Sequence, residues 1–166
     1  FIVAHNARFD RAFVDKNSSI SPKKIWACSI KDIDWFSKGF SNQKQELLCY
    51  WHGFYCEAHR AMNDVDALIQ LMIHPYYDKN RPILDLIKNA KKIICKILVT
   101  NFPYDEQKKD MIKSYGYKWN TKEKIWYKEI FQQELEFEKN YLSETVYDGQ
   151  FRGSYEEINP NEKYKS

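Results

Sequence analysis

The sequence lacks the features of a membrane-spanning or secreted protein. No stretch approaches the roughly 20 apolar residues that a helix needs to cross a bilayer. The longest candidate, Ile93–Val99, is short and is interrupted by Cys95 and Lys96. The segment Phe1–His5 has no basic region and no cleavable apolar core, so it does not indicate a secretory signal. We therefore expect a soluble, cytoplasmic protein without membrane contacts.

The sequence also has no strong excess of positive or negative charge. It contains no C-x-x-C cysteine pair, no internal repeat and no low-complexity tract. The formal net charge is only +3, which does not mark a nucleic-acid binder unless the charges are clustered. The four cysteines lie in apolar surroundings, which favours reduced thiols. Hydrophobic residues make up 43% of the 166 residues, enough for one domain or for one truncated domain with a small partner. Because the chain opens at Phe1 within an apolar run, we expect a fragment or a processed product.

Apolar spacing predicts alternating strands and helices over residues 1–90, the first of three expected parts. Strands are expected over 1–3 and 25–29, and helices over 6–16, 42–53, 58–74 and 83–90. The helix over 6–16 has apolar residues at Phe9, Ala12 and Phe13. The apolar stripe of the helix over 58–74 would consist of Ala61, Val65, Leu68, Leu71 and Met72.

The second part, residues 91–132, has the pattern of a small βαββ module. It contains a β-rich run over 93–100, a helical segment over 105–115 and a hairpin over 117–130. The third part, residues 133–166, is polar and acidic, so we expect a tail that is disordered in part.

Two short segments carry the residues with the clearest chemistry. The segment AHNARFD (4–10) follows an apolar strand, and HRAMND (59–64) opens an amphipathic helix. Alone, Asp10 would be a solvated charge at a helix start, and His59 a cap or a satisfied polar residue. Together they place carboxylates on two elements, with an imidazole five residues before Asp64. Two-metal phosphodiester hydrolysis needs such carboxylates around cations about 3.5–4 Å apart, and a base near the attacking water.

Residues 4–10 resemble the AHNAxFD motif, and residues 59–64 the HxAxxD motif, of the DEDDh-type 3′→5′ exonuclease family. This family includes the proofreading epsilon subunit of bacterial DNA polymerase III, ribonuclease T and oligoribonuclease. The resemblance covers roughly residues 1–75. It implies an α/β, RNase H-like fold with a mixed sheet and two Mg²⁺ or Mn²⁺ ions. It also implies single-stranded DNA or RNA 3′ ends as substrates, 5′-mononucleotides as products, and a DNA polymerase or repair complex as a partner.

The resemblance also implies a role for each matching residue. Asp10 would hold the second metal, partly through water, and Asp64 would coordinate the metal that carries the nucleophilic water. His59 would be the catalytic base that accepts the proton of that water.

Four further residues would bind the substrate. His5, Asn6 and Phe9 would shape the pocket for the terminal nucleotide, and Arg60 would contact phosphate. The alternatives are a turn for the two polar residues, core packing for Phe9, and plain solvation for Arg60.

The sequence departs from the family in one important respect. The first motif of the family, an Asp-x-Glu on a strand, supplies two of the four metal carboxylates, and these 166 residues contain no such strand. The segment Asp64-Val65-Asp66 falls on a predicted helix. We therefore expect the isolated chain to be nearly inactive. A non-catalytic nucleic-acid-binding protein with a degenerate exonuclease fold is the alternative.

A second alternative is a zinc-stabilised interaction domain. Cys49, His52, Cys56 and His59 have the spacing C-x2-H-x3-C-x2-H, and thiolates with imidazoles are the ligands of tetrahedral zinc sites. Buried cysteines, however, usually pack as small hydrophobic residues.

The region 97–130 resembles a small module of unknown function that is appended to nucleic-acid enzymes. The resemblance rests on Pro103-Tyr104, on Gly-x-x-Trp at 116–119 and on Lys-x-Trp-Tyr at 124–127. Lysines alternate with aromatic residues here, and basic surfaces bind phosphates while exposed rings stack on bases. The candidate nucleic-acid contacts are Tyr117, Lys118, Lys124 and Tyr127. In the alternative interpretation, Trp119 and Trp126 pair across the hairpin as a small core and the lysines are solvated.

Overall fold

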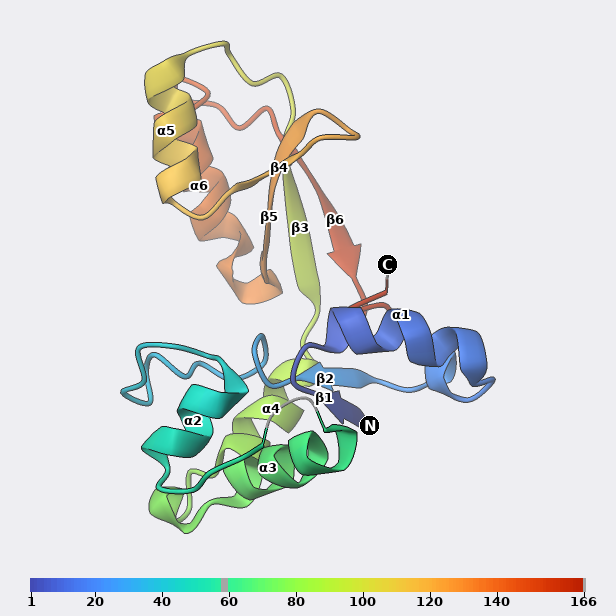
Figure 1. Ribbon diagram of the computed structural model, residues 1–166. Helices are drawn as coiled ribbons and strands as arrows, with labels where there is room; N and C mark the ends of the chain where they lie inside the picture. The colour runs from blue at the N-terminus through green and yellow to red at the C-terminus, as the bar shows by residue number, and fades with distance from the viewer. Residues whose placement is uncertain (58–59, 166) are drawn as a thin grey trace. The chain divides into compact units, whose positions relative to one another are not determined.

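The computed structural model describes residues 1–57 and 60–165 and shows a mixed α/β protein (Figure 1). The chain forms two compact units: unit 1 comprises residues 1–91 and 160–166, and unit 2 comprises residues 92–159. The predicted boundary at residues 90–93 coincides with the first crossing between the units. The predicted tail, in contrast, is divided between them. Among the described residues, no helix is both long and apolar enough to cross a membrane.

Unit 1 begins with a short parallel sheet. Strands β1 (Ile2–Ala4) and β2 (Trp26–Cys28) pair with Ile2 opposite Trp26, and helix α1 (Ala7–Asn17) lies between them in the chain. A 3-10 turn over Ser21–Lys23 leads from α1 into β2. Strand β2 is buried along its whole length, so this small sheet is anchored in the interior of unit 1.

Three further helices form the main core of unit 1: α2 (Gln45–Trp51), α3 (Ala61–Ile73) and α4 (Pro82–Ala90). They follow the predicted segments, although α2 is shorter than 42–53. A 3-10 turn over Pro75–Tyr77 separates α3 from α4. Fully buried members of this core include Trp35, Leu48, Leu71 and Leu86.

The apolar stripes predicted for α1 and α3 are wrong in part. Phe9 is 76% exposed and Phe13 72% exposed, whereas Arg11 of the same helix is completely buried. On α3 the buried residues are Ala67, Leu68, Leu71 and Met72. A second stripe at helical spacing, Met62, Val65, Ile69 and Ile73, is exposed. The sequence shows that these helices have apolar residues, but the tertiary structure decides which of them pack.

Unit 2 is a four-stranded antiparallel sheet with two helices. Its elements follow in the order β3 (Ile94–Val99), α5 (Glu106–Ser114), β4 (Lys118–Asn120), β5 (Ile125–Phe131), α6 (Leu135–Thr145) and β6 (Ser154–Ile158). A 3-10 turn over Gln132–Glu134 joins β5 to α6. The strand order in the sheet is β4-β5-β3-β6. The first four elements have the predicted βαββ order.

The last two elements of unit 2 correct the prediction of a partly disordered tail. Helix α6 buries Leu135 and Leu142 against the sheet, and β6 pairs with β3 through backbone hydrogen bonds. Residues 160–165 then return to unit 1, where Tyr164 packs with Ala7 and Trp26. The acidic composition of this region is compatible with order because only one face of α6 needs to be apolar.

Candidate functional site

A pocket of about 1290 Å³ in unit 1 brings the two sequence motifs together. Its walls come largely from β1, from α1 and α3, and from residues 41–46, which include the start of α2. Asp10 and Asp64 both line it, and so do His5, Asn6 and Phe9. Five of the predicted site residues therefore share one cavity, although the two motifs are far apart in the sequence.

Two predicted site residues are placed differently. His59, the predicted base, lies outside the described residues. Arg60 is not part of the pocket wall, and its exposed guanidinium pairs with Glu57 at 3.3 Å. This pairing fits the solvated alternative for Arg60 better than a phosphate contact.

Local backbone structure explains why the carboxylates reach the pocket. Strand β1 ends at Ala4, and the carbonyl of Asn6 accepts the backbone N–H groups of Phe9 and Asp10 at 2.9 and 3.2 Å. Asp10 and Asp64 therefore both stand in the first turn of a helix. The helix dipole stabilises negative charge at this position. Both carboxylates thus occupy helix ends that favour anionic side chains.

The start of α2 is tied to α3 through Gln45. Its side-chain amide donates to the carbonyl of Asp64 at 2.6 Å. Partial burial raises the pKa of Asp10, and a backbone hydrogen bond at Asn6 opposes this effect. The sequence analysis placed Gln45 in a helix over 42–53 but not in the site, because no motif marks this segment and only the tertiary structure brings it to the pocket.

His5 is a partly buried polar residue of the pocket wall. Its Nδ1 lies 2.7 Å from the hydroxyl of Ser29, which is completely buried. Burial lowers the pKa of His5, while a backbone hydrogen bond at Gln43 and the charge of Asp64 act in the opposite direction. A neutral imidazole at this position can position neighbouring groups by hydrogen bonding without adding charge to the pocket.

Acidification is expected to destabilise unit 1 through His5. Because its pKa is lowered on folding from the ordinary value of 6.5, the unfolded chain binds the proton more readily. The stabilising contribution is therefore complete above about pH 6.5 and is lost as the pH falls through the folded pKa. Urea unfolding between about pH 8 and about pH 5 measures this loss. The variant His5→Gln should show a shallower decline, and identical pH profiles for variant and parent would refute the expectation.

The described residues do not form a complete metal centre. Among residues 1–57 and 60–165, no three His, Cys, Asp or Glu side chains come together as ligands. Asp10 and Asp64 nevertheless have the chemistry that Mg²⁺ prefers, because this ion binds one or two carboxylates together with substrate phosphates. The pair therefore fits part of a Mg²⁺ site that phosphate or further carboxylates would complete.

The zinc interpretation fails for the members that the structure describes. Cys49, His52 and Cys56 are not arranged as metal ligands. His52 uses both ring nitrogens elsewhere, with Nδ1 2.6 Å from the carbonyl of Leu48 and Nε2 2.5 Å from the hydroxyl of Tyr77. Burial raises the pKa of the Cys49 thiol, and its contact with Cys56 adds to the effect.

The predicted nucleic-acid contacts of unit 2 separate into buried and accessible residues. Tyr117 is only 3% exposed and its hydroxyl donates to Glu138 at 2.7 Å, so it belongs to the core and is not available to stack on a base. Lys118 and Lys124 are exposed, and Tyr127 is half-buried on the sheet.

The tryptophans of the hairpin pair as the alternative interpretation expected, but they do not form the core of the module. Trp119 and Trp126 face each other across β4 and β5, with ring centroids 5.4 Å apart. Trp126 packs against the core of unit 2, whereas Trp119 is 46% exposed. The pair therefore covers the edge of the hairpin and does not fill the interior.

No protein family, curated protein or solved structure matches this chain.

Proposed function

We propose that unit 1 is part of a 3′→5′ exonuclease domain, and that its pocket receives the 3′ end of a single-stranded nucleic acid. The supporting observation is that Asp10 and Asp64 line one cavity with His5, Asn6 and Phe9. In this proposal the two carboxylates hold divalent metal, and His59 is the general base. The RNase H-like fold of the complete domain is part of the same proposal.

The size and the lining residues of the pocket suit a nucleotide. Its volume exceeds the roughly 300–1,000 Å³ of typical small-molecule sites, which leaves room for the end of a polymer. Phe9 lines the cavity with a largely exposed ring, and stacking on such a ring stabilises a bound base. A bound Mg²⁺ or Mn²⁺ would neutralise phosphate charge and activate water. Asp10 and Asp64 are the residues that would hold it.

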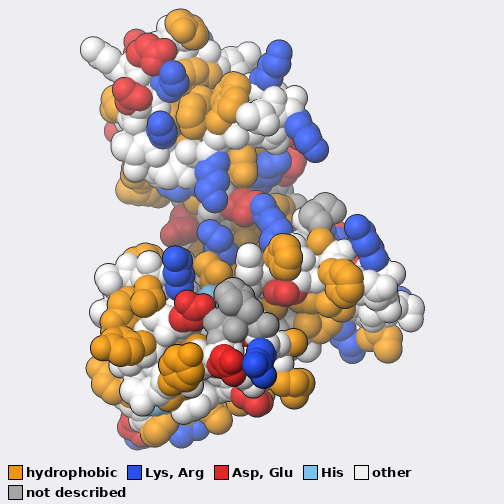
Figure 2. Space-filling view, in the orientation of Figure 1, with side chains coloured by type: hydrophobic (Ala, Val, Ile, Leu, Met, Phe, Trp, Pro, Cys, Tyr) orange, Lys and Arg blue, Asp and Glu red, His pale blue; other side chains and the backbone are white. Residues whose placement is uncertain are grey.

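Two surface features of unit 1 support the proposal that additional strands complete the site. Among the described residues, β1 pairs only with β2, so its other edge has no strand partner. A two-stranded sheet is marginal without additional strands or packing. Apolar side chains are also exposed on the face of this unit that Figure 2 shows. The exposed apolar residues of unit 1 include Phe9 and Phe13 of α1 and Val65 of α3, and large exposed apolar surfaces mark interaction sites. In the proposal, strands that carry an Asp-x-Glu pair add to β1 and cover this surface.

A nucleoside 5′-monophosphate, the proposed product, should bind the pocket of the 166-residue protein in the presence of Mg²⁺. We expect dTMP or UMP to shift the amide NMR signals of Asn6, Asp10 and Asp64. Signals of unit 2, such as that of Ile112, should stay unchanged. The variant Asp64→Asn should weaken the binding because it removes a metal-binding carboxylate. If the nucleotides leave the pocket signals unchanged, the proposal is wrong.

A non-catalytic nucleic-acid-binding role is the second candidate. The observation that favours it is that the described residues contain no group of three metal ligands. This role predicts nucleotide binding that does not depend on Mg²⁺, so repeating the titration with EDTA distinguishes the two functions.

A further inference from the structure

One face of the unit 2 sheet is not covered by the helices of that unit. Ile112 of α5 and Leu142 of α6 pack on the same face as Cys95 and Ile97 of β3, and in Figure 1 both helices lie on one side of the sheet. The order β-α-β-β-α-β with strands β4-β5-β3-β6 is a split β-α-β arrangement, in which both helices share a face. We call the opposite side the open face.

Strand alternation and register identify the side chains on the open face. Because Cys95 and Ile97 point toward the helices, Lys96 and Leu98 point the other way. Tyr127 lies opposite Leu98, and Lys118 lies opposite Tyr127. The Lys96 ammonium is 5.4 Å from the centre of the Tyr127 ring, which places both on the same side of the sheet.

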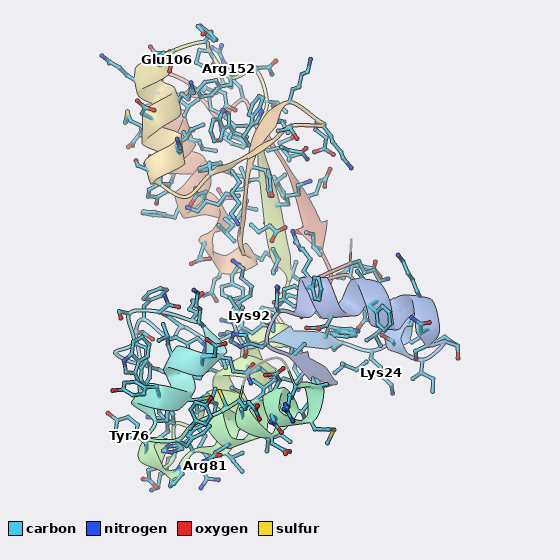
Figure 3. The ribbon with its side chains drawn as sticks, viewed as in Figure 1. Lys24, Tyr76, Arg81, Lys92, Glu106 and Arg152 are labelled. Atoms are coloured by element: carbon cyan, nitrogen blue, oxygen red, sulfur yellow. The ribbon has the colours of Figure 1, made fainter. Side chains whose placement is uncertain are left out.

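Most lysines elsewhere in unit 2 are neutralised by a carboxylate. Lys108 pairs with Asp148 at 2.9 Å and Lys128 with Glu138 at 3.2 Å. At the start of α5, Lys109 pairs with Glu106, which is labelled in Figure 3, at 3.0 Å. The positive charge of each of these lysines is therefore balanced by a carboxylate of the same unit.

Three exposed lysines at the hairpin end of the open face differ. In the described part of unit 2, Lys118, Lys122 and Lys124 form no ion pair and donate no side-chain hydrogen bond. Lys118 lies opposite Tyr127 in the register, and Lys122 and Lys124 lie in the β4–β5 turn, where Glu123 pairs with Lys96 at 3.8 Å. In the next row of the sheet, Glu129 and Glu156 flank Lys96. This acidic row limits the positive surface to the hairpin end.

We propose that the hairpin end of the open face binds single-stranded nucleic acid. Tyr127 stacks on one base, and Lys118, Lys122 and Lys124 contact neighbouring phosphates. Four-stranded sheets with helices on one face bind unpaired bases on aromatic rings of the other face, and adjacent lysines provide the sequence-independent attraction. This site is separate from the pocket of unit 1, and it would hold the strand independently of any cleavage.

Fluorescence anisotropy of the full 166-residue protein tests the proposal. The protein should carry Asp10→Asn and Asp64→Asn, so that metal-dependent binding in the pocket does not contribute, and the buffer should contain EDTA. The probes are fluorescein-labelled oligo(dT) and oligo(U) of about ten nucleotides, within the range of such sites. We expect Tyr127→Ala to weaken binding about five-fold or more. Lys118→Ala should reduce the slope of log K against log salt by about 0.7–1.

Lys113→Ala is the matched control, because Lys113 is equally exposed and unpaired but lies on α5, away from the open face. It should leave affinity and salt slope nearly unchanged. Circular dichroism of each variant verifies folding. If the half-buried Tyr127 proves necessary for folding, the exposed Lys118 carries the test. The proposal is wrong if neither probe binds at low salt, or if Lys113→Ala and Lys118→Ala weaken binding equally.

Discussion

Adding strands with an Asp-x-Glu pair before Phe1 is expected to convert an inactive protein into a Mg²⁺-dependent 3′→5′ exonuclease. The 166-residue protein alone should release no mononucleotides from a 3′ end. Its pocket wall contains Asp10, Asp64 and Glu46, but the described residues form no group of three metal ligands, and the Asp-x-Glu pair is lacking. Two-metal hydrolysis needs enough carboxylates to hold both ions close to one phosphate. The measurement is the release of labelled 5′-mononucleotides from a 3′-end-labelled oligonucleotide with Mg²⁺ or Mn²⁺.

Two variants of the extended protein test the roles of the pocket residues. His59→Ala should lower the rate about 10²–10⁴-fold, the usual contribution of a general base. Asp64→Asn should abolish metal-dependent release. An extension that carries Asn-x-Gln in place of Asp-x-Glu is the matched control, because it adds the same strands without the charges. Strong release by this control, or by the unextended protein, would contradict the assignment.

The variant Arg11→Met is expected to lower the free energy of unfolding by about 3–5 kcal/mol, the usual cost of removing one partner of a buried ion pair. The guanidinium of Arg11 is completely buried. It donates to the carbonyls of Lys163 and Asn161 at 2.6 and 2.8 Å, and it pairs with Asp15 at 3.0 Å. Methionine fills a similar volume but leaves these acceptors without a donor. Urea unfolding at neutral pH measures the loss.

Lys16→Met is the control for this prediction. Lys16 lies on the same helix but is exposed, and exposed substitutions usually change stability by less than about 0.5 kcal/mol. If both variants unfold at the same urea concentration as the parent, the carboxyl-terminal segment is not held through Arg11.

The carboxyl-terminal segment has a second anchor in the interior of unit 1. The buried ammonium of Lys163 donates to the carbonyl of Asn89 at 2.7 Å and lies 3.7 Å from Asp32. The hydroxyl of Tyr164 donates to the same carboxylate at 2.9 Å. Burial raises the pKa of Asp32, whereas Lys163 and Tyr164 help to keep it ionised. Residues 160–165 are therefore an integral part of unit 1 and not a disordered end.

Local signals in the sequence were sufficient where an element is stabilised by its neighbours in the chain. Helix α5 is an example: Asp105 accepts the backbone N–H groups of Gln107 and Lys108 at 2.8 and 3.0 Å, and Gly116 follows the helix with a positive φ of 95°. Both residue types favour these positions for local reasons. The order of the elements from residue 1 to residue 131 could be predicted for the same reason.

Strand β6 shows where local signals were not sufficient. Its residues are mostly polar and exposed, and it is held at the edge of the sheet by backbone pairing with β3. Such pairing does not require an apolar pattern, so the sequence of this segment does not predict a strand. Glu138 was likewise read as part of a polar tail, but it is buried because Tyr117 and Lys128 satisfy its carboxylate.

The sequence by itself determined the types of residue that could carry chemistry and the local elements on which they stand. It could not determine that Asp10 and Asp64 line one cavity, that Phe9 is exposed, or that Arg11 is buried. These properties depend on contacts between segments that are distant in the chain. Periodicity specifies the faces of a helix, but only the packing of the whole unit selects which face is buried and which residues meet.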